Sequence, residues 1–226
     1  MLLEMTRPVQ GGLRQERKLE AVANHLANAD TTGFKRDVVS FDKTFKAMTN
    51  RDFSQGPIQP TGNPLDVAIA GQGLFKIETP DGIKYTRNGN FTRDGNGTLV
   101  DQNGNPVLGQ GGAVQIEGES ININEAGEIF VDGGFVDTLD IVTFEDLTRV
   151  KKDSQNNLTY DGDTQDEVVP DEIRVKQMAL EGANIAVVDE MVRMIDYHRM
   201  YEIFQKSMQT FDEVDGKAIN DVGKLT

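Results

Sequence analysis

The sequence contains no cysteine and no tryptophan, and it has only two histidines. Without cysteine, the chain can form no disulfide, thiolate nucleophile or cysteine-ligated metal site. His25 and His198 fall in different predicted helices, and neither has a second histidine at the spacing of a zinc motif. We therefore expect both to be ordinary helix residues, and we expect neither a cofactor nor enzymatic activity.

Long apolar runs are also missing. The sequence has no stretch of about 18 consecutive apolar residues, which a membrane-spanning helix requires. Residues 1–9 lack the basic and apolar regions of a cleaved secretory signal. We expect a chain that does not insert into a membrane and that leaves the cytoplasm, if it does so, without such a signal.

The charge is strongly acidic and unevenly distributed. The net charge is −14, and residues 61–178 carry 21 acidic against nine basic side chains. Residues 1–60 carry nine basic against seven acidic side chains. An acidic body repels phosphate groups, so we expect neither nucleic acid nor an anionic lipid surface as a partner.

An apolar stripe marks a helix near the N-terminus. Residues 13–28 are rich in helix-forming side chains, and Leu19, Val22 and Leu26 recur at spacings of three and four. This pattern predicts a helix with one apolar face.

The two ends of this helix differ in strength. Pro8 and the pair Gly11-Gly12 disfavour helix before residue 13, so we expect a helix that is secure only from there. The turn residues after Asn28 predict its end, because Gly33 can adopt the positive φ that other residues resist. The apolar seam should therefore centre on residues 19–26.

Residues 35–63 predict a linker or arm between the N-terminal helical segment (residues 1–34) and the central domain. Glycines and prolines interrupt regular structure here. Phe41 and Phe45 have the spacing of one face of a short helix.

Residues 64–178 predict an all-β domain. Apolar and polar residues alternate from Leu65 onward, and turn signals such as Asn88-Gly89 and Asp94-Gly95 recur at close intervals. We interpret Gly71-Gln72-Gly73 as a hairpin turn. Further strands are predicted at residues 114–116, 120–123, 128–131 and 139–144.

Two segments of this domain have part of the pattern of a calcium loop. Residues 94–98 and 101–105 provide aspartate and asparagine at alternate positions, but leucine and proline replace the glycine required at the sixth. We interpret both as turns rather than metal sites.

Residues 179–226 predict a C-terminal helical segment. No proline or glycine interrupts residues 185–208, and a heptad row includes Tyr197, Tyr201, Phe204 and Met208. Val188, Val192 and Ile195 form a second row beside it. A helix with so broad an apolar face needs a partner.

Three segments resemble a known family. ANHLANADTTGFKR (residues 23–36) resembles the N-terminal hallmark of the flagellar rod and hook axial proteins. Residues 61–109 resemble the family's β region, through the stretches TGNPLDVAIAGQGLF, YTRNGNF and GTLVDQNGNPVLG. LEGANIAVVDEMVRMIDYHRMYE (residues 180–202) resembles the family's C-terminal helix. The short middle domain and the stretch PVLG (residues 106–109) favour the proximal rod type over the distal type.

The resemblance implies a mainly β central domain whose N- and C-terminal α-helices pair as a coiled coil. It further implies a structural subunit of the bacterial flagellar basal-body rod, which crosses the periplasm. The implied partners are the chain itself, other rod proteins and the flagellar export apparatus. The predicted assembly residues are Leu19, Val22, Leu26, Asn28, Gly33, Phe34, Val188, Val192, Ile195, Tyr201, Phe204 and Met208.

Two hypotheses accompany this reading. We expect the terminal segments to be largely disordered in an isolated monomer, because helices without a packing partner are marginal. The alternative function is a soluble acidic β-domain that binds a ligand or polymer, with helices that only close the fold.

Overall fold

The structure is a computed structural model that describes residues 2–42, 46–153, 156–162, 166–170 and 172–223. The chain divides into two compact units. We call the described residues of Met1–Ala27, Asp37–Asn50 and Ala186–Thr226 the helical unit, and those of Asn28–Arg36 and Arg51–Ile185 the β unit. The fold is thus mainly β, with one helix towards each terminus, as the sequence predicted.

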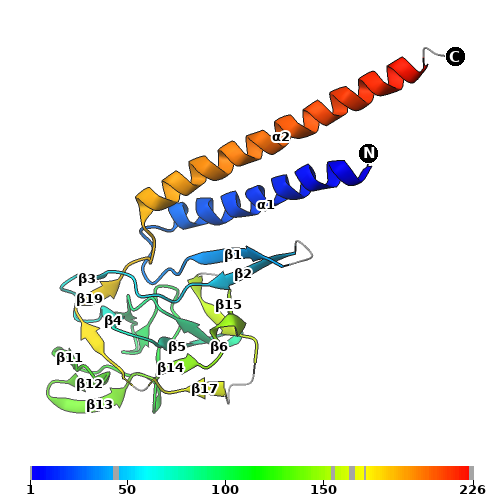
Figure 1. Cartoon of the computed structure of the whole chain (residues 1–226). Coiled ribbons are helices and arrows are strands. Elements are labelled where there is room, and N and C mark those ends of the chain that lie inside the picture. The colour runs from blue at the N-terminus through cyan, green and yellow to red at the C-terminus, as the bar shows by residue number, and fades with distance from the viewer. Residues whose placement is uncertain (1, 43–45, 154–155, 163–165, 171, 224–226) are drawn as a thin grey trace. The chain divides into compact units, whose positions relative to one another are not determined.

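The helical unit contains two long helices, α1 (Leu2–Ala27) and α2 (Val187–Gly223). They contact each other and lie side by side, as Figure 1 shows in blue and in orange to red. A pair of antiparallel strands, β1 (Asp37–Phe41) and β2 (Ala47–Arg51), also belongs largely to this unit, and β1 contacts α1.

The start of α1 differs from the prediction. The helix continues without a break through Pro8 and Gly11-Gly12, although those residues disfavour it. Packing supplies the reason, because a Cβ atom on Gly11 would lie only 2.5 Å from Cζ of Phe204 in α2. The glycine lets the two helices approach closely, and this contact outweighs the weak local propensity. The predicted end near residue 28 is confirmed.

Residues 35–63 contain strands rather than the short helix suggested by Phe41 and Phe45. Phe41 ends β1, and Phe45 lies outside the described residues. Beyond β2, the strand β3 (Ile58–Pro60) pairs with β19 (Ala179–Glu181), just before α2. Pairing of β1 with the neighbouring β2 therefore overrides the local helical spacing of Phe41.

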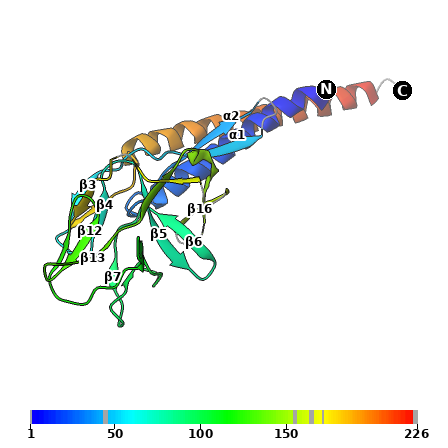
Figure 2. The same ribbon diagram turned by 90° about the horizontal axis from the view of Figure 1, so that it is seen from below.

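The β unit is built on a six-stranded antiparallel sheet in the order β15-β16-β6-β5-β14-β17. Its strands are β15 (Val150–Lys152), β16 (Leu158–Tyr160), β6 (Gly82–Thr86), β5 (Leu74–Thr79), β14 (Ile141–Phe144) and β17 (Glu167–Val168). The hairpin of β5 and β6 stands out in Figure 2. A 3₁₀ turn, η1 (Leu147–Arg149), precedes β15.

Smaller sheets complete the β unit. A three-stranded sheet is formed by β11 (Ile121–Ile123), β12 (Glu128–Val131) and β13 (Gly134–Thr138). The paired strands are β4 (Val67–Ile69) with β18 (Val175–Gln177), β7 (Thr92–Arg93) with β8 (Leu99–Val100), and β9 (Leu108–Gly109) with β10 (Gly112–Ala113).

Alternation along the central strands divides the buried apolar side chains into two clusters. Phe75 and Ile77 of β5 enter a cluster that includes Ile141, whereas Leu74 enters a second cluster with Val142. Successive side chains of a strand point to opposite faces, so one sheet supports both cores.

Some local strand and turn predictions were wrong. Gly71-Gln72-Gly73 connects β4 to β5, but these strands pair with other partners, so the segment is not a hairpin turn. Residues 114–116 form no strand, although Val114 and Ile116 are buried. Residues 94–98 and 101–105 are turns as predicted, because Asp94 and Asp101 accept hydrogen bonds from backbone N–H groups two and four residues later.

Candidate functional site

One buried polar pair joins the last turn of α1 to the first turn of α2. Nδ1 of His25 lies 3.0 Å from Oε2 of Glu190, and both side chains are almost completely buried. Nε2 of His25 accepts a hydrogen bond of 2.9 Å from the backbone N–H of Asp37 at the start of β1. His25 thus joins three elements of the helical unit and is not the ordinary helix residue expected from the sequence.

These contacts determine the tautomer of the imidazole. Because Nε2 accepts from an N–H group, the ring proton must be on Nδ1, where it is donated to Glu190. Both ring nitrogens are engaged in hydrogen bonds within the protein. The imidazole therefore holds the helices and β1 together and has no nitrogen available for a substrate.

Aromatic side chains of α2 also contact α1, with Phe204 next to Gly11. Lys18 lies over the ring of Tyr197, with its Nζ 5.2 Å from the ring centroid. Val22 is buried, while Leu19 and Leu26 are half-buried. On α2, the predicted residues of the heptad row are half-buried, namely Tyr201, Phe204 and Met208.

The second predicted row of α2 is exposed. Val188, Val192 and Ile195 have exposed fractions of 73%, 54% and 54%. At 100° per residue, this row lies on the side of the helix opposite Glu190 and the heptad row, so the prediction that it lies beside the heptad row was wrong. The N-terminal turns of α2 therefore have two apolar faces, and only one of them contacts α1.

The turn after α1 begins the β unit. The backbone carbonyl of Asn28 accepts a hydrogen bond of 3.0 Å from the N–H of Thr31. Gly33 has a φ of +68°, as predicted, and its N–H donates to the carbonyl of Glu181 at 2.7 Å. Phe34 is 1% exposed, and the Nζ of Lys152 lies 4.6 Å from its ring centroid.

A buried ionic cluster follows this turn, and we call it the junction cluster: Lys35, Arg87 and Glu181. Nζ of Lys35 lies 2.7 Å from Oε1 of Glu181, and Nε of Arg87 lies 2.5 Å from Oε2. The three side chains are at most 4% exposed. One carboxylate therefore holds two cations that come from distant parts of the chain.

Backbone groups complete the junction cluster. The N–H of Gly56 donates to Oε1 of Glu181 at 2.7 Å, and Nζ of Lys35 donates to the carbonyl of Ser54 at 2.6 Å. The guanidinium of Arg87 donates to carbonyl oxygens of Ile69, Gly71 and Gly73. Arg87 thus fixes the β4–β5 connection.

Burial lowers the pKa of the Lys35 ammonium, and the hydrogen bond to Glu181 acts in the opposite direction. Desolvation disfavours the charged form of a lysine, whereas an adjacent carboxylate favours it. The direction of the net shift shows that burial outweighs the single carboxylate, which is shared with Arg87.

The side-chain amide of Asn184 forms hydrogen bonds with two other segments near the junction cluster. Its Oδ1 accepts from the N–H of Arg36 at 2.8 Å, and its Nδ2 donates to the carbonyl of Asp52 at 2.7 Å. Its own N–H donates to the carbonyl of Phe34 at 3.3 Å. The segment before α2 is therefore hydrogen-bonded to the turn after α1, within the β unit.

The sequence analysis did not identify Lys35, Arg87, Glu181 and Asn184 as site residues. All four lie in segments that carried the family resemblance: Lys35 in Gly-Phe-Lys, Arg87 in YTRNGNF, and Glu181 and Asn184 in LEGAN. A charged residue flanked by small and apolar residues was the available signal. The resemblance did not indicate that these residues contact one another, because their contacts depend on tertiary structure.

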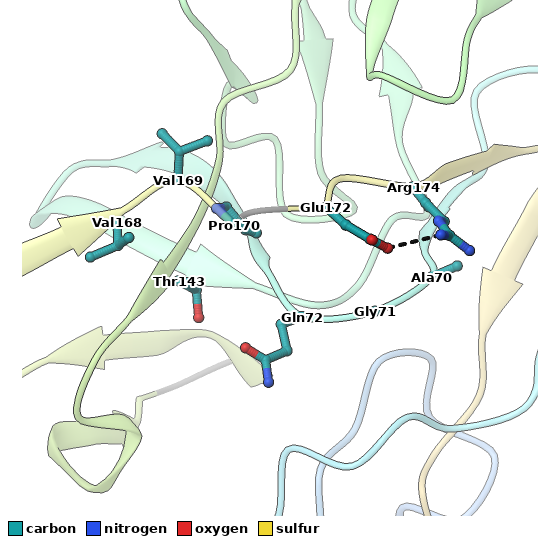
Figure 3. A pocket seen from close by; sticks show the side chains of 9 residues that line it. All are labelled: Ala70, Gly71, Gln72, Thr143, Val168, Val169, Pro170, Glu172 and Arg174. Carbon is teal, nitrogen blue, oxygen red and sulfur yellow. Dashed lines mark hydrogen bonds and ion pairs between the residues drawn. The ribbon is translucent and has the colours of Figure 1, made fainter.

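The β unit also contains an open hollow of about 580 Å³ beside β17. Figure 3 shows Gln72, Thr143 and Val168 around it, with Glu172 directed towards Arg174. Those two charged residues pair with each other at 2.8 Å, and the described residues around the hollow include no combination of an acid, a base and a nucleophile. In the described part of the chain, no group of three potential metal ligands occurs, and no helix is apolar enough over a sufficient length to cross a membrane.

Three segments of the chain match models of known protein families. The family described as "Flagella basal body rod protein" matches residues 11–35, which include most of α1 and the turn with Gly33. "Flagellar hook protein FlgE/F/G D1 domain" matches residues 68–131, and "Flagellar basal body rod FlgEFG protein C-terminal" matches residues 176–221.

Whole-chain relatives support the same family. The flagellar basal-body rod protein FlgF of Caulobacter vibrioides is 33% identical, and the alignment covers 92% of this chain and 93% of the relative. The chain belongs to the flagellar basal-body rod protein family. FlgF of Rhizobium meliloti is 31% identical over 92% of each chain, and FlgG of Bacillus subtilis is 29% identical over 97% of this chain and 99% of the relative.

Membership of the rod family makes this chain a structural component of the flagellar basal body. The predicted resemblance to FlgF, with FlgG second, is confirmed. The junction cluster connects segments that match different family models. Lys35 lies at the end of the segment 11–35, and Glu181 lies within the segment 176–221.

Proposed function

We propose that this rod-family chain is a non-enzymatic subunit that assembles with copies of itself and with other rod proteins through α1 and α2. The observation that carries the proposal is the second apolar row of α2. Val188, Val192 and Ile195 are exposed on the side of the helix opposite the α1 contact. A helix that is apolar on two sides needs two partners, and α1 supplies only one.

The α1–α2 contact itself is proposed to be a coiled coil. The row of Tyr197, Tyr201, Phe204 and Met208 has the 4-3-4 spacing of a heptad seam, and these side chains are half-buried. Gly11 opposite Phe204 and Val22 near the His25–Glu190 pair provide the matching face of α1.

Assembly would be driven by covering the second row. Full burial of each large aliphatic side chain contributes about 1.5–3 kcal/mol. If the covering surface lies elsewhere on the next copy, the contact is heterologous and does not close, which produces an open helical tube. Such a tube is the expected form of a rod.

Replacing the second row tests the proposal. We expect the double variant Val192→Gln/Ile195→Gln to lose concentration-dependent assembly, because two apolar anchors are removed from the interface. Sedimentation velocity and electron microscopy would measure the assembly over a range of protein concentrations. Both substituted side chains are exposed in the single chain, so the variant should have the same helical circular dichroism as the parent at concentrations where both are monomeric.

The matched control is Arg199→Gln/Glu202→Gln on the same helix. Both side chains are exposed and polar, and the double change leaves the net charge unaltered. This control should assemble as the parent does. Equal assembly of the Val192/Ile195 variant and the parent would refute the proposed interface.

The same proposal predicts weak protection of the helices in a dilute monomer. Hydrogen exchange should be fast at residues 13–28 and 185–212 and slow in the central strands, because the helices lack most of their partners before assembly. Strong protection of both helices in a monodisperse monomer would contradict this prediction. Weakly ordered ends would also suit passage through the flagellar export apparatus, the proposed export partner.

A further inference from the structure

The β unit contains the same reactive dipeptide at three places. Asparagine precedes glycine at Asn88-Gly89, Asn96-Gly97 and Asn103-Gly104. Glycine has no side chain, so its backbone nitrogen can approach the side-chain carbonyl carbon (Cγ) of the preceding asparagine with little steric hindrance. Attack at that carbon releases the side-chain nitrogen of the asparagine as ammonia. Because the three dipeptides are identical, their surroundings decide which of them reacts in the folded protein.

Asn88 and Gly89 are both held in place. The side-chain oxygen of Asn88 accepts a hydrogen bond of 3.0 Å from the N–H of Asn90, and its backbone N–H donates to the hydroxyl of Thr86 at 3.1 Å. Gly89 is buried, and its carbonyl accepts from the N–H of Val67 at 2.9 Å. The reacting atoms of this dipeptide cannot meet unless several of these contacts break.

Asn103 lies in an exposed turn, but both of its reacting groups are restrained. Its side-chain nitrogen lies 3.5 Å from Oδ2 of Asp101, and the N–H of Gly104 donates to the carbonyl of Asp101 at 3.1 Å. The carboxylate of Asp101 also accepts from the backbone N–H and the side-chain nitrogen of Asn105, at 2.8 and 2.9 Å. Because Asp101 is buried, this carboxylate anchors the whole turn.

Asn96 is the least restrained of the three asparagines. Its side chain is exposed, and its side-chain amide forms no hydrogen bond within the described part of the chain. The N–H of Gly97 donates to the carbonyl of Asp94 at 3.2 Å. Among the described contacts, this hydrogen bond alone restrains the two reacting groups. The carbonyl of Gly97 is fixed by the N–H of Ile116 at 2.7 Å, but it takes no part in the reaction.

We propose that Asn96 is a site of spontaneous deamidation in the folded protein. The backbone nitrogen of Gly97 loses its proton and attacks Cγ of Asn96. The new N–Cγ bond forms, the bond from Cγ to the side-chain nitrogen breaks, and that nitrogen takes up a proton and leaves as ammonia. The product is a five-membered succinimide ring. Water then opens the ring at either of its two carbonyls, so residue 96 becomes aspartate or isoaspartate.

Both products change the turn between β7 and β8. Each places a new carboxylate two residues from Asp94, and isoaspartate also lengthens the main chain of the turn by one atom. The reaction makes the net charge of −14 more negative by one unit, so anion exchange separates the product from the parent chain. The site is independent of the proposed assembly surface, because it involves none of the apolar residues of α2.

Peptide mapping of the full chain tests the proposal. The folded protein would be incubated at mildly alkaline pH, where more of the backbone nitrogen is deprotonated, and mass spectrometry would follow each Asn-Gly peptide over time. We expect Asn96 to be converted about tenfold faster than Asn88, with Asn103 between them, because the rate depends steeply on how easily the reacting atoms meet. The same incubation in urea removes the fold, and the three rates should then converge.

Two matched variants check the assignment on anion exchange. Asn96→Gln keeps an exposed amide but would require a larger ring, so it should remove the first acidic product that the parent chain forms. Asn103→Gln makes the same change in the neighbouring exposed turn and should leave that product in place. Equal conversion of the three asparagines in the folded protein, or faster conversion of Asn88 or Asn103 than of Asn96, would overturn the proposal. So would an Asn96 peptide that stays intact in the folded protein while it reacts in urea.

Discussion

Replacing Glu181 with glutamine is expected to lower the free energy of unfolding of the β unit by about 3–5 kcal/mol. The carboxylate is buried and contacts both Lys35 and Arg87, so its loss leaves two buried cations without their shared counter-charge. Urea denaturation of the full chain, followed by circular dichroism of the β-sheet signal, would measure the change.

Hydrogen bonding makes glutamine a poor substitute at this position. Oε1 of Glu181 accepts from Lys35 and from the N–H of Gly56, while Oε2 accepts from Arg87. A glutamine amide has only one oxygen, so its NH₂ group must face a donor on one side or the other. The variant therefore loses charge and also sets donor against donor in a buried place.

Glu172→Gln is the control, because it makes the same glutamate-to-glutamine change in an exposed ion pair. Glu172 pairs with Arg174 at 2.8 Å, but both side chains are largely exposed. We expect a loss of no more than about 1 kcal/mol, as for most exposed ion pairs. If the two variants lose equal stability, the junction cluster does not hold the β unit together as the structure indicates.

The sequence predicted the elements whose cause is local. The apolar stripe of Leu19, Val22 and Leu26 predicted α1, and the alternation of residues 128–131 predicted β12. The turn at Gly33 was predicted because its chemistry is contained within a few residues. Such features need no knowledge of distant contacts.

Features that depend on distant contacts were missed. The helical turns before residue 13 form because Gly11 packs against Phe204, almost two hundred residues away. Gly71-Gln72-Gly73 was read as a hairpin turn, but its carbonyls are held by Arg87 and its flanking strands pair elsewhere. Periodicity within a window contains no information about such partners.

The contacts of the junction cluster also could not be predicted from local sequence patterns. Lys35 and Glu181 are 146 positions apart, and Arg87 lies between them in the sequence. Charged residues are usually exposed, so their types alone predict a solvated position. Only the fold places these three side chains in one buried group. The resemblance to the rod family nevertheless covered all three segments involved, although it did not indicate their contact.

Gly33→Ala is expected to destabilise the β unit by about 2–5 kcal/mol, for two separable reasons. The φ of +68° costs an L-residue with a side chain about 1–2 kcal/mol. The new Cβ atom would also lie 2.5 Å from the backbone N of Asn88 and 2.6 Å from the backbone carbonyl carbon of Arg87, which adds about 1–3 kcal/mol of overpacking. Urea denaturation of the full chain would measure the sum.

Gly62→Ala separates the two contributions. Gly62 has a similar φ of +80°, but a Cβ atom there meets nothing within 4 Å. This variant should lose only the conformational part, about 1–2 kcal/mol. The difference between the two variants then measures how closely the turn packs on the backbone of Arg87, whose side chain holds Glu181. If Gly33→Ala costs no more than Gly62→Ala, the close packing of the turn against that backbone does not contribute to stability, and the role of Gly33 reduces to its backbone conformation.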